Sequence, residues 1–343
     1  MASITLNDGT VIGDYNKPYY VAEVNSSHNG SVDIAKDMVI KAKEIGCDCV
    51  KFQSWSAESL YSKTYYNNNP IAKRIVKKFA LSRDEQKKIS SFCKEYNISF
   101  ASTPYSEEEV DFLLDECNVP YIKIASMDVI TIPFLQYIAK KNTAIVLATG
   151  MADGEEIKRA VDTILDAGNE RLCMLHCISI YPSKPEMMQI NNIIGLRETF
   201  PYIPIGFSDH TKGYEIACAS VALGSCMIEK HFTLDNKKMG MDNNMATEPE
   251  EFAALISCCN NVFDALGTTD RVISDAELEQ RRKMRRSVIA ARNLNEGDVI
   301  NRSDLLLKRP GDGIPADKLD FLVGKTLLCD VEEDTIINYG DIK

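Results

Sequence analysis

The sequence predicts an α/β protein in which a (β/α)8 TIM barrel is followed by a small β-rich domain. Short apolar segments alternate with helix-like segments from the start of the chain to about residue 267, and there are eight apolar segments. Continuously apolar strands separated by helices pair in parallel and are covered on both faces. Eight such units favour closure into a barrel, with an open doubly wound sheet as the structural alternative.

The eight predicted barrel strands cover residues 19–24, 49–53, 98–102, 121–125, 144–148, 172–176, 203–206 and 226–231. Between them, apolar residues recur at intervals of three and four, which predicts amphipathic helices. The best-defined helices cover residues 32–45, 83–96, 107–116, 155–167 and 249–266. Ser82 precedes Glu85 by three residues, which is the spacing of a capping box at a helix start.

The domain organisation follows from a change in composition near residue 268. We expect a barrel domain at 1–268, a charged linker at 269–286 and a β-rich domain at 287–343, where Asn, Asp, Gly and Pro clusters predict turns. The linker carries Arg281, Arg282, Arg285 and Arg286. These arginines suit either a solvated face or a position near an anionic site. A β-rich module of about 55 residues is marginally stable alone, so we expect it to dock on another surface.

The composition excludes several classes of protein. A formal net charge of −11 argues against a nucleic-acid-binding surface, which is usually basic. No apolar run approaches the roughly 20 residues that span a bilayer, so no membrane partner is expected. The eleven cysteines are scattered through apolar segments, a pattern that suits buried free thiols in a reducing cytoplasm better than a disulfide framework or a zinc site.

Ionisable residues gather where the predicted strands end, which is the active face of a parallel barrel. The stretch "MIEKHFTLD" ends the eighth strand with Glu229, Lys230 and His231, and the chain's other three histidines, His28, His176 and His210, also lie at or just after strand ends. We expect this charged tail and all four histidines at the barrel mouth. His210 and His231 follow neighbouring strands and could bind one divalent cation, with the substrate completing the coordination.

Lysines and hydroxyl groups at the same face predict an anion site. Lys51 and Lys123 interrupt apolar strands, where a lysine is rarely buried without a partner. Outward-pointing lysines and a Schiff-base lysine are the alternatives. Thr103, Ser126 and Ser208 lie on the same rim. Glu23 ends the first strand, where a carboxylate suits proton transfer or, alternatively, pairs with a lysine.

These motifs together resemble the sialic acid synthase family. The resemblance rests on the order of "AEVNSSHNG", "VKFQ", "STPYS", "YIKIAS", "ATGM", "IYP", "FSDHT", "VALG", "EKHFTLD" and, in the small domain, "KRPGDG". It implies a metal-dependent condensation of phosphoenolpyruvate with an N-acetylmannosamine-like amino sugar, which gives a nine-carbon nonulosonic acid and phosphate. It also implies that the small domain is an antifreeze-like (SAF) domain, which covers the partner's barrel mouth in a domain-swapped homodimer.

The resemblance assigns roles to individual residues. It makes Glu23, Lys51, Lys123 and His231 catalytic, and it places the metal, usually manganese and alternatively magnesium or cobalt, on His210 and His231. Phosphoenolpyruvate would bind Lys51, Thr103, Lys123, Ser126 and Ser208. The sugar would contact Gln53, Tyr181 and Asp242, together with Arg309 of the partner subunit's SAF domain.

Departures from the family pattern concern the sugar. Asn243 and Ala246 stand where many relatives have His and Ser, so we expect an acceptor other than plain N-acetylmannosamine, such as a deoxy-diamino sugar. Two other functions remain as alternatives: a synthase or aldolase acting on a phosphorylated aldose, and a carbohydrate-binding protein without catalysis.

Overall fold

The computed structural model describes residues 1–238 and 240–343, and the chain divides into two compact units, Met1–Gly267 and Thr268–Lys343. In the described part of the chain, no helix is long and apolar enough to cross a membrane.

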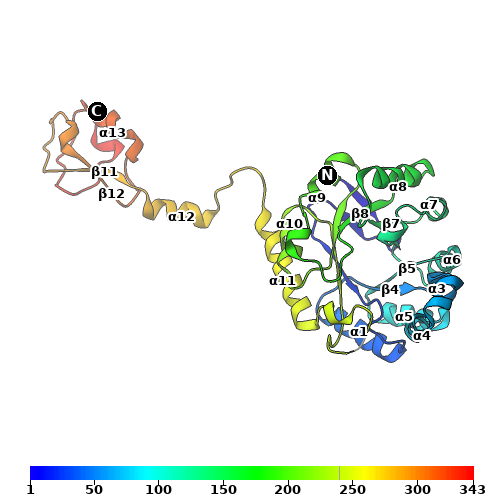
Figure 1. The fold of residues 1–343 in the computed structure, drawn as a ribbon. Coiled ribbons are helices and arrows are strands. Elements are labelled where there is room, and N and C mark those ends of the chain that lie inside the picture. The colour runs from blue at the N-terminus through cyan, green and yellow to red at the C-terminus, as the bar shows by residue number, and fades with distance from the viewer. Residues whose placement is uncertain (239) are drawn as a thin grey trace. The chain divides into compact units, whose positions relative to one another are not determined.

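The first unit is built on a closed barrel of eight parallel strands (Figure 1). These are β3 (Tyr19–Glu23), β4 (Cys49–Ser54), β5 (Ser99–Pro104), β6 (Ile122–Ile124), β7 (Ile145–Ala148), β8 (Leu172–Cys177), β9 (Ile205–Asp209) and β10 (Met227–His231). β10 pairs with both β9 and β3, which closes the sheet. The predicted barrel is therefore confirmed, each strand lies at a predicted segment, and the open sheet is excluded.

Helices follow the strands and surround the barrel (Figure 1). They are α1 (Val32–Glu44), α2 (Ala57–Leu60), α3 (Lys63–Asn68), α4 (Pro70–Phe79), α5 (Arg83–Glu95), α6 (Glu107–Asp115), α7 (Ile132–Lys140), α8 (Gly154–Asp166), α9 (Asn192–Thr199), α10 (Glu215–Ala222) and α11 (Pro249–Leu266). The predicted capping box at Ser82 and Glu85 is present at the start of α5.

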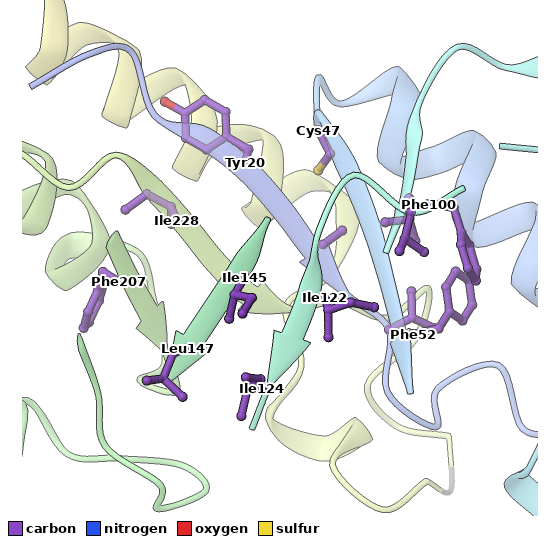
Figure 2. Close-up of a cluster of buried hydrophobic side chains, with 14 of the residues drawn as sticks. Tyr20, Cys47, Phe52, Phe100, Ile122, Ile124, Ile145, Leu147, Phe207 and Ile228 are labelled. Carbon is purple, nitrogen blue, oxygen red and sulfur yellow. The ribbon is translucent and has the colours of Figure 1, made fainter. Parts of the chain in front are cut away.

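The strands bury both faces, but against different partners. Figure 2 shows side chains of the outer cluster, including Phe52, Ile122, Leu147 and Phe207, which pack between strands and helices. The alternate residues form a second cluster inside the barrel. We call its strand residues, together with Tyr121 directly before β6, the apolar layer: Tyr19, Val21, Cys49, Ala101, Tyr121, Val146, Cys173, Leu175 and Met227. The two-residue period of a strand separates the two clusters.

An N-terminal hairpin, absent from the sequence prediction, adds to the interior cluster. β1 (Ser3–Thr5) pairs antiparallel with β2 (Val11–Gly13). Leu6 and Ile12 pack with the apolar layer, and the Asn7 N–H donates to the Pro120 carbonyl at 2.8 Å. Strands of three residues are too short to show a clear alternation.

The second unit has its own small core. β11 (Ser287–Ala290) and β12 (Leu305–Lys308) pair antiparallel, and apolar residues such as Val288, Ile314 and Leu322 are buried around them. A short helix, α13 (Leu319–Leu322), completes the core. The predicted linker segment contains the helix α12 (Asp275–Met284), whose N-cap is Ser274.

Candidate active site

A layer of charged side chains occupies the barrel interior next to the apolar layer. The side chains are Glu23, Lys51, Lys123 and Glu229. Each lies two residues beyond an apolar-layer residue on the same strand or, for Lys123, directly before it, so they share its inward direction. We call these four side chains the charged layer. Each is at most 4% exposed. Four ionisable groups at this burial are stable only because they pair with one another.

Glu229 is the centre of the charged layer, and the sequence analysis did not assign it a role. Lys123 Nζ donates to Glu229 Oε1 at 2.7 Å and to Oε2 at 2.9 Å, across the barrel from β6 to β10. Lys51 Nζ lies 3.7 Å from Glu229 Oε2. Burial opposes ionisation of this carboxyl, but the two ammonium groups hold the pKa of Glu229 down at about 2. Glu229 is therefore favoured as an anion, hydrogen-bonded to Lys123 and close to Lys51.

Glu23 has the opposite electrostatic balance. Its Oε1 accepts from the Asn25 N–H at 3.1 Å and from Gln53 Nε2 at 3.2 Å. Its Oε2 forms an ion pair with Lys51 but no aligned hydrogen bond. Burial raises the pKa of Glu23, and the Lys51 charge only partly opposes this effect. A carboxyl tuned upward suits exchange of a proton near neutral pH.

The amide of Gln53 is held in one orientation. Its Oε1 accepts from Trp55 Nε1 and from the Tyr105 hydroxyl, both at 3.0 Å. The NH2 group must therefore face Glu23. Trp55 and Tyr105 act on the site through Gln53, and neither was identified from the sequence.

Two of the three predicted hydroxyl residues contact the charged layer. Lys51 Nζ donates to Thr103 Oγ1 at 3.3 Å, and Ser208 Oγ donates to Glu229 Oε1 at 3.1 Å. Ser126 Oγ accepts from the Gly150 N–H at 3.1 Å. Thr103 and Ser208 thus contact the charged layer directly, whereas Ser126 is tied to the turn after β7.

Only two of the four histidines converge, which corrects the expectation that all four meet at the mouth. The rings of His210 and His231 lie 5.4 Å apart between centres. His176 alternates with the inward-facing Leu175 and stacks on Phe207 in the outer cluster. His28 accepts the Gly30 N–H at Nδ1 and lies against Phe52, which also faces outward.

The same alternation corrects the expectation for the tail of "MIEKHFTLD". Glu229 faces inward to Lys123, whereas Lys230 belongs to the opposite face and pairs with Asp209.

The pair of imidazoles fits a divalent metal ion. His210 Nδ1 lies 2.8 Å from the Ile178 carbonyl, which can only accept, so Nδ1 carries the proton and Nε2 is left as a ligand. Burial, with the neighbouring charge of Lys51, holds the pKa of His231 well below its usual range, which keeps this ring in the neutral, ligating form. Among residues 1–238 and 240–343, no group of three or more His, Cys, Asp or Glu side chains is arranged around an ion. Water or substrate would supply the remaining ligands.

Comparisons with known proteins identify the family. Residues 38–271 match the NeuB family, and residues 285–343 match the SAF domain. This chain belongs to the NeuB family of nonulosonic acid synthases. It is therefore an enzyme, a transferase that forms carbon–carbon bonds.

Characterised relatives of this synthase are matched over nearly their whole length. The chain is 33% identical to the N,N′-diacetyllegionaminic acid synthase of Legionella pneumophila, over 95% of this chain and 94% of that protein. It is 33% identical to the human N-acetylneuraminate-9-phosphate synthase, over 97% and 95% respectively. The crystal structure of N-acetylneuraminic acid synthetase from Leptospira borgpetersenii matches with a TM-score of 0.75 and 30% identity, over 81% of this chain and 94% of that chain.

Of the predicted sugar-contacting residues, Tyr181 and Asp242 lie in the first unit and Arg309 lies in the second. Tyr181 lies over His210, with ring centres 4.2 Å apart, and Asp242 accepts from the Asn25 amide, so both border the histidine pair or the Glu23 loop. Arg309 belongs to the second unit, where it is exposed.

Asn243, which the sequence analysis connected with the choice of sugar, is committed to its own loop. It is buried, and its NH2 group donates to the carbonyls of Asp235 and Lys238 at 2.7 and 2.8 Å. Its Oδ1 accepts from the Thr233 hydroxyl at 2.5 Å. All its polar atoms are occupied, so Asn243 can shape the loop but has no free group for a substrate.

Proposed function

We propose that this synthase condenses phosphoenolpyruvate with a six-carbon amino sugar of the N-acetylmannosamine type, giving a nine-carbon nonulosonic acid and phosphate. The observation that carries the proposal is the charged layer with its two buried lysines, together with the two convergent imidazoles at the active face of a NeuB-family barrel. This arrangement offers cationic groups for an acidic phosphate ester and a metal site for a carbonyl group.

Phosphoenolpyruvate would bind to Lys51 and Lys123, with hydroxyl donors from Thr103, Ser126 and Ser208. The two lysines and two carboxylates of the charged layer cancel in formal charge. A multiply charged anion therefore needs additional positive charge or loss of a negative one. A divalent ion held by His210 and His231 would supply positive charge beside the anion, so that Glu23 can stay ionised for its role with water.

The chain's groups then act on each step of the condensation. The C2=C3 π electrons of phosphoenolpyruvate form a new bond from C3 to the sugar's aldehyde carbon, while the C=O π pair moves to the aldehyde oxygen, which gains a proton and becomes a hydroxyl group. Water then adds to the cationic C2. Glu23 would orient this water and accept its proton at Oε2, while Gln53 holds Oε1. Phosphate leaves from the tetrahedral intermediate, stabilised by the lysines. A divalent ion held by His210 and His231 would supply Lewis acidity to the aldehyde; manganese is our proposed ion, with magnesium or cobalt as alternatives.

We propose a deoxy-diacetamido hexose as the acceptor. Support comes from the Legionella relative, whose name specifies two N-acetyl groups. Gln53, Tyr181 and Asp242 would contact the sugar. The protein would work in the cytoplasm, a proposal supported by its eleven free cysteines.

We further propose a homodimer in which each SAF domain covers the other subunit's barrel. The exposed Arg309 would reach the sugar's acyl group in that assembly.

The experiment that tests the function is phosphate release from phosphoenolpyruvate in the presence of Mn²⁺. The panel of acceptors contains N-acetylmannosamine, its 6-phosphate and deoxy-diacetamido hexoses. We expect release that depends on one sugar, with a nine-carbon acid detected by mass spectrometry. Equal or faster turnover of N-acetylmannosamine would contradict the proposed acceptor, and no release with any sugar would contradict the synthase reaction.

The second part of the experiment removes the metal with a chelator. We expect turnover to be lost on metal removal and restored by added Mn²⁺. Turnover that persists in metal-free protein would contradict the metal site.

A further inference from the structure

A second buried ion pair lies immediately behind the two histidines, outside the barrel interior. Asp209 and Lys230 are 0% and 2% exposed, and Lys230 Nζ lies 2.7 Å from Asp209 Oδ2. Neither residue points into the charged layer, because each alternates with an inward-facing neighbour, Ser208 and Glu229. The proposed chemistry makes no use of this pair.

The contacts of the pair enclose His210 on both sides. Asp209 Oδ1 accepts from the Thr211 N–H at 2.9 Å and from the Thr211 hydroxyl at 2.8 Å. Lys230 Nζ also donates to the Thr211 carbonyl at 2.6 Å. The residues before and after His210 are therefore both bound to Lys230, and Lys230 directly precedes His231.

The position of the Asp209–Lys230 ion pair in the sheet indicates what the pair does. The ladder between β9 and β10 ends at the rung that joins Asp209 to Lys230. His210 and His231 lie one residue beyond that rung, where no hydrogen bond between these two strands fixes their separation. Beyond this rung, the ion pair and the Thr211 contacts link the two strand ends that carry the imidazoles.

We propose that Asp209 and Lys230 are positioning residues that set the spacing of His210 and His231, and thereby the affinity of the divalent ion site. This inference rests on the proposed function, in which those imidazoles hold the ion. Removing charges that orient metal ligands typically weakens metal binding about 10- to 100-fold. Stability alone gives a poorer account of the pair, because a buried ion pair adds little net stability over apolar residues of similar size.

The test uses the double variant Asp209→Asn/Lys230→Met. Asparagine keeps an oxygen for the Thr211 N–H, and the double change leaves no unpaired buried charge. The matched control is Asp14→Asn/Arg197→Met, which removes an ion pair that contacts the other end of β9: Asp14 Oδ2 lies 3.2 Å from Arg197 Nε, and Asp14 Oδ1 accepts the N–H of Ile205, where β9 begins. Both variants are full-length, and both are compared with the unaltered protein.

The first measurement is Mn²⁺ binding without substrates, followed by electron paramagnetic resonance of the free ion. We expect the dissociation constant of the Asp209/Lys230 double variant to rise at least tenfold and that of the control to stay within about twofold. In assays, the Mn²⁺ concentration for half-maximal rate should rise likewise, while kcat at saturating Mn²⁺ recovers. A purely structural role would not produce this pattern.

The outcomes separate the inference from the proposed function. Mn²⁺ affinity within twofold of the unaltered protein in a folded double variant overturns the positioning role alone. Absence of Mn²⁺ binding in the unaltered protein overturns both. If the double variant does not fold, Lys230→Arg keeps the charge but alters its reach, and unchanged Mn²⁺ affinity in this variant equally overturns the positioning role.

Discussion

The apolar and charged layers of the barrel interior are built on the same strands, two residues apart, yet they have opposite energetics. Val21, Tyr121 and Met227 fill the apolar layer, and Glu23, Lys123 and Glu229 follow them in the charged layer. Both layers are almost fully buried. Burial stabilises the first set through the hydrophobic effect, whereas it penalises the second set unless the charges pair.

The comparison of the two layers indicates which of them forms the active site. A barrel that only needed stability would continue the apolar layer to the end of the strands, since well-packed apolar residues replace buried ion pairs without loss. The charged layer instead occupies the end at which parallel barrels carry their active sites. Substitutions in the apolar layer should therefore lower stability without lowering activity, whereas substitutions in the charged layer should lower activity.

The largest expected effect is that of Glu23→Gln. Glutamine preserves the shape and the contact with Asn25 but cannot take a proton, so kcat/KM should fall about 10²- to 10⁴-fold. In the unaltered protein, kcat/KM should fall as the pH drops through the raised pKa of Glu23, because protonation removes the ionised base. This acid limb should disappear in the variant. A fully active Glu23→Gln would place the acid/base group elsewhere.

Lys123→Met should lower kcat/KM for phosphoenolpyruvate about 10²- to 10³-fold, because the phosphate loses a buried cation. The matched control is Tyr121→Phe in the apolar layer, two residues earlier in the chain, whose hydroxyl lies 3.9 Å from Cys49 Sγ. Its kinetics should remain within about twofold of normal. Equal losses in both variants would remove the distinction between the layers.

Leu175→Ala, in the apolar layer, should lower stability and leave activity unchanged. Leu175 is fully buried in the interior cluster, so truncation should lower the free energy of unfolding by about 2–5 kcal/mol. Activity per folded molecule should stay within about twofold. Chemical denaturation and active-site titration measure the two quantities, and a catalytic loss without a stability loss would contradict the assignment.

Arg309→Ala has the smallest expected effect, because in the proposed swapped dimer it would remove one charge-assisted hydrogen bond to the sugar. We expect the KM for the sugar to rise about tenfold, with Mn²⁺ affinity unchanged. Mixing this variant with Glu23→Gln tests the swapped dimer. A heterodimer would combine one normal barrel with a normal Arg309, so activity with the original KM should return. Failure of this recovery, after subunit exchange is verified, would contradict the swapped arrangement.

Much of the fold was predictable because its pattern is local. Eight apolar segments gave the strand positions within a few residues, and the Ser82 and Glu85 spacing gave the start of α5. The hairpin of β1 and β2 was missed because three-residue strands carry too little pattern. The convergence of His210 and His231 was predictable because they end neighbouring strands, but the same reasoning wrongly included His28 and His176.

The sequence by itself determined the order of the elements, the residue types at the strand ends and the family motifs, because these depend on local periodicity and composition. Only the tertiary structure decided which side chains meet. Closure of the barrel brings Lys123 to Glu229 across 106 residues of sequence, and strand alternation turns Lys230 and His176 away from the interior. These contacts depend on the phase and curvature of the whole sheet, which no single segment encodes.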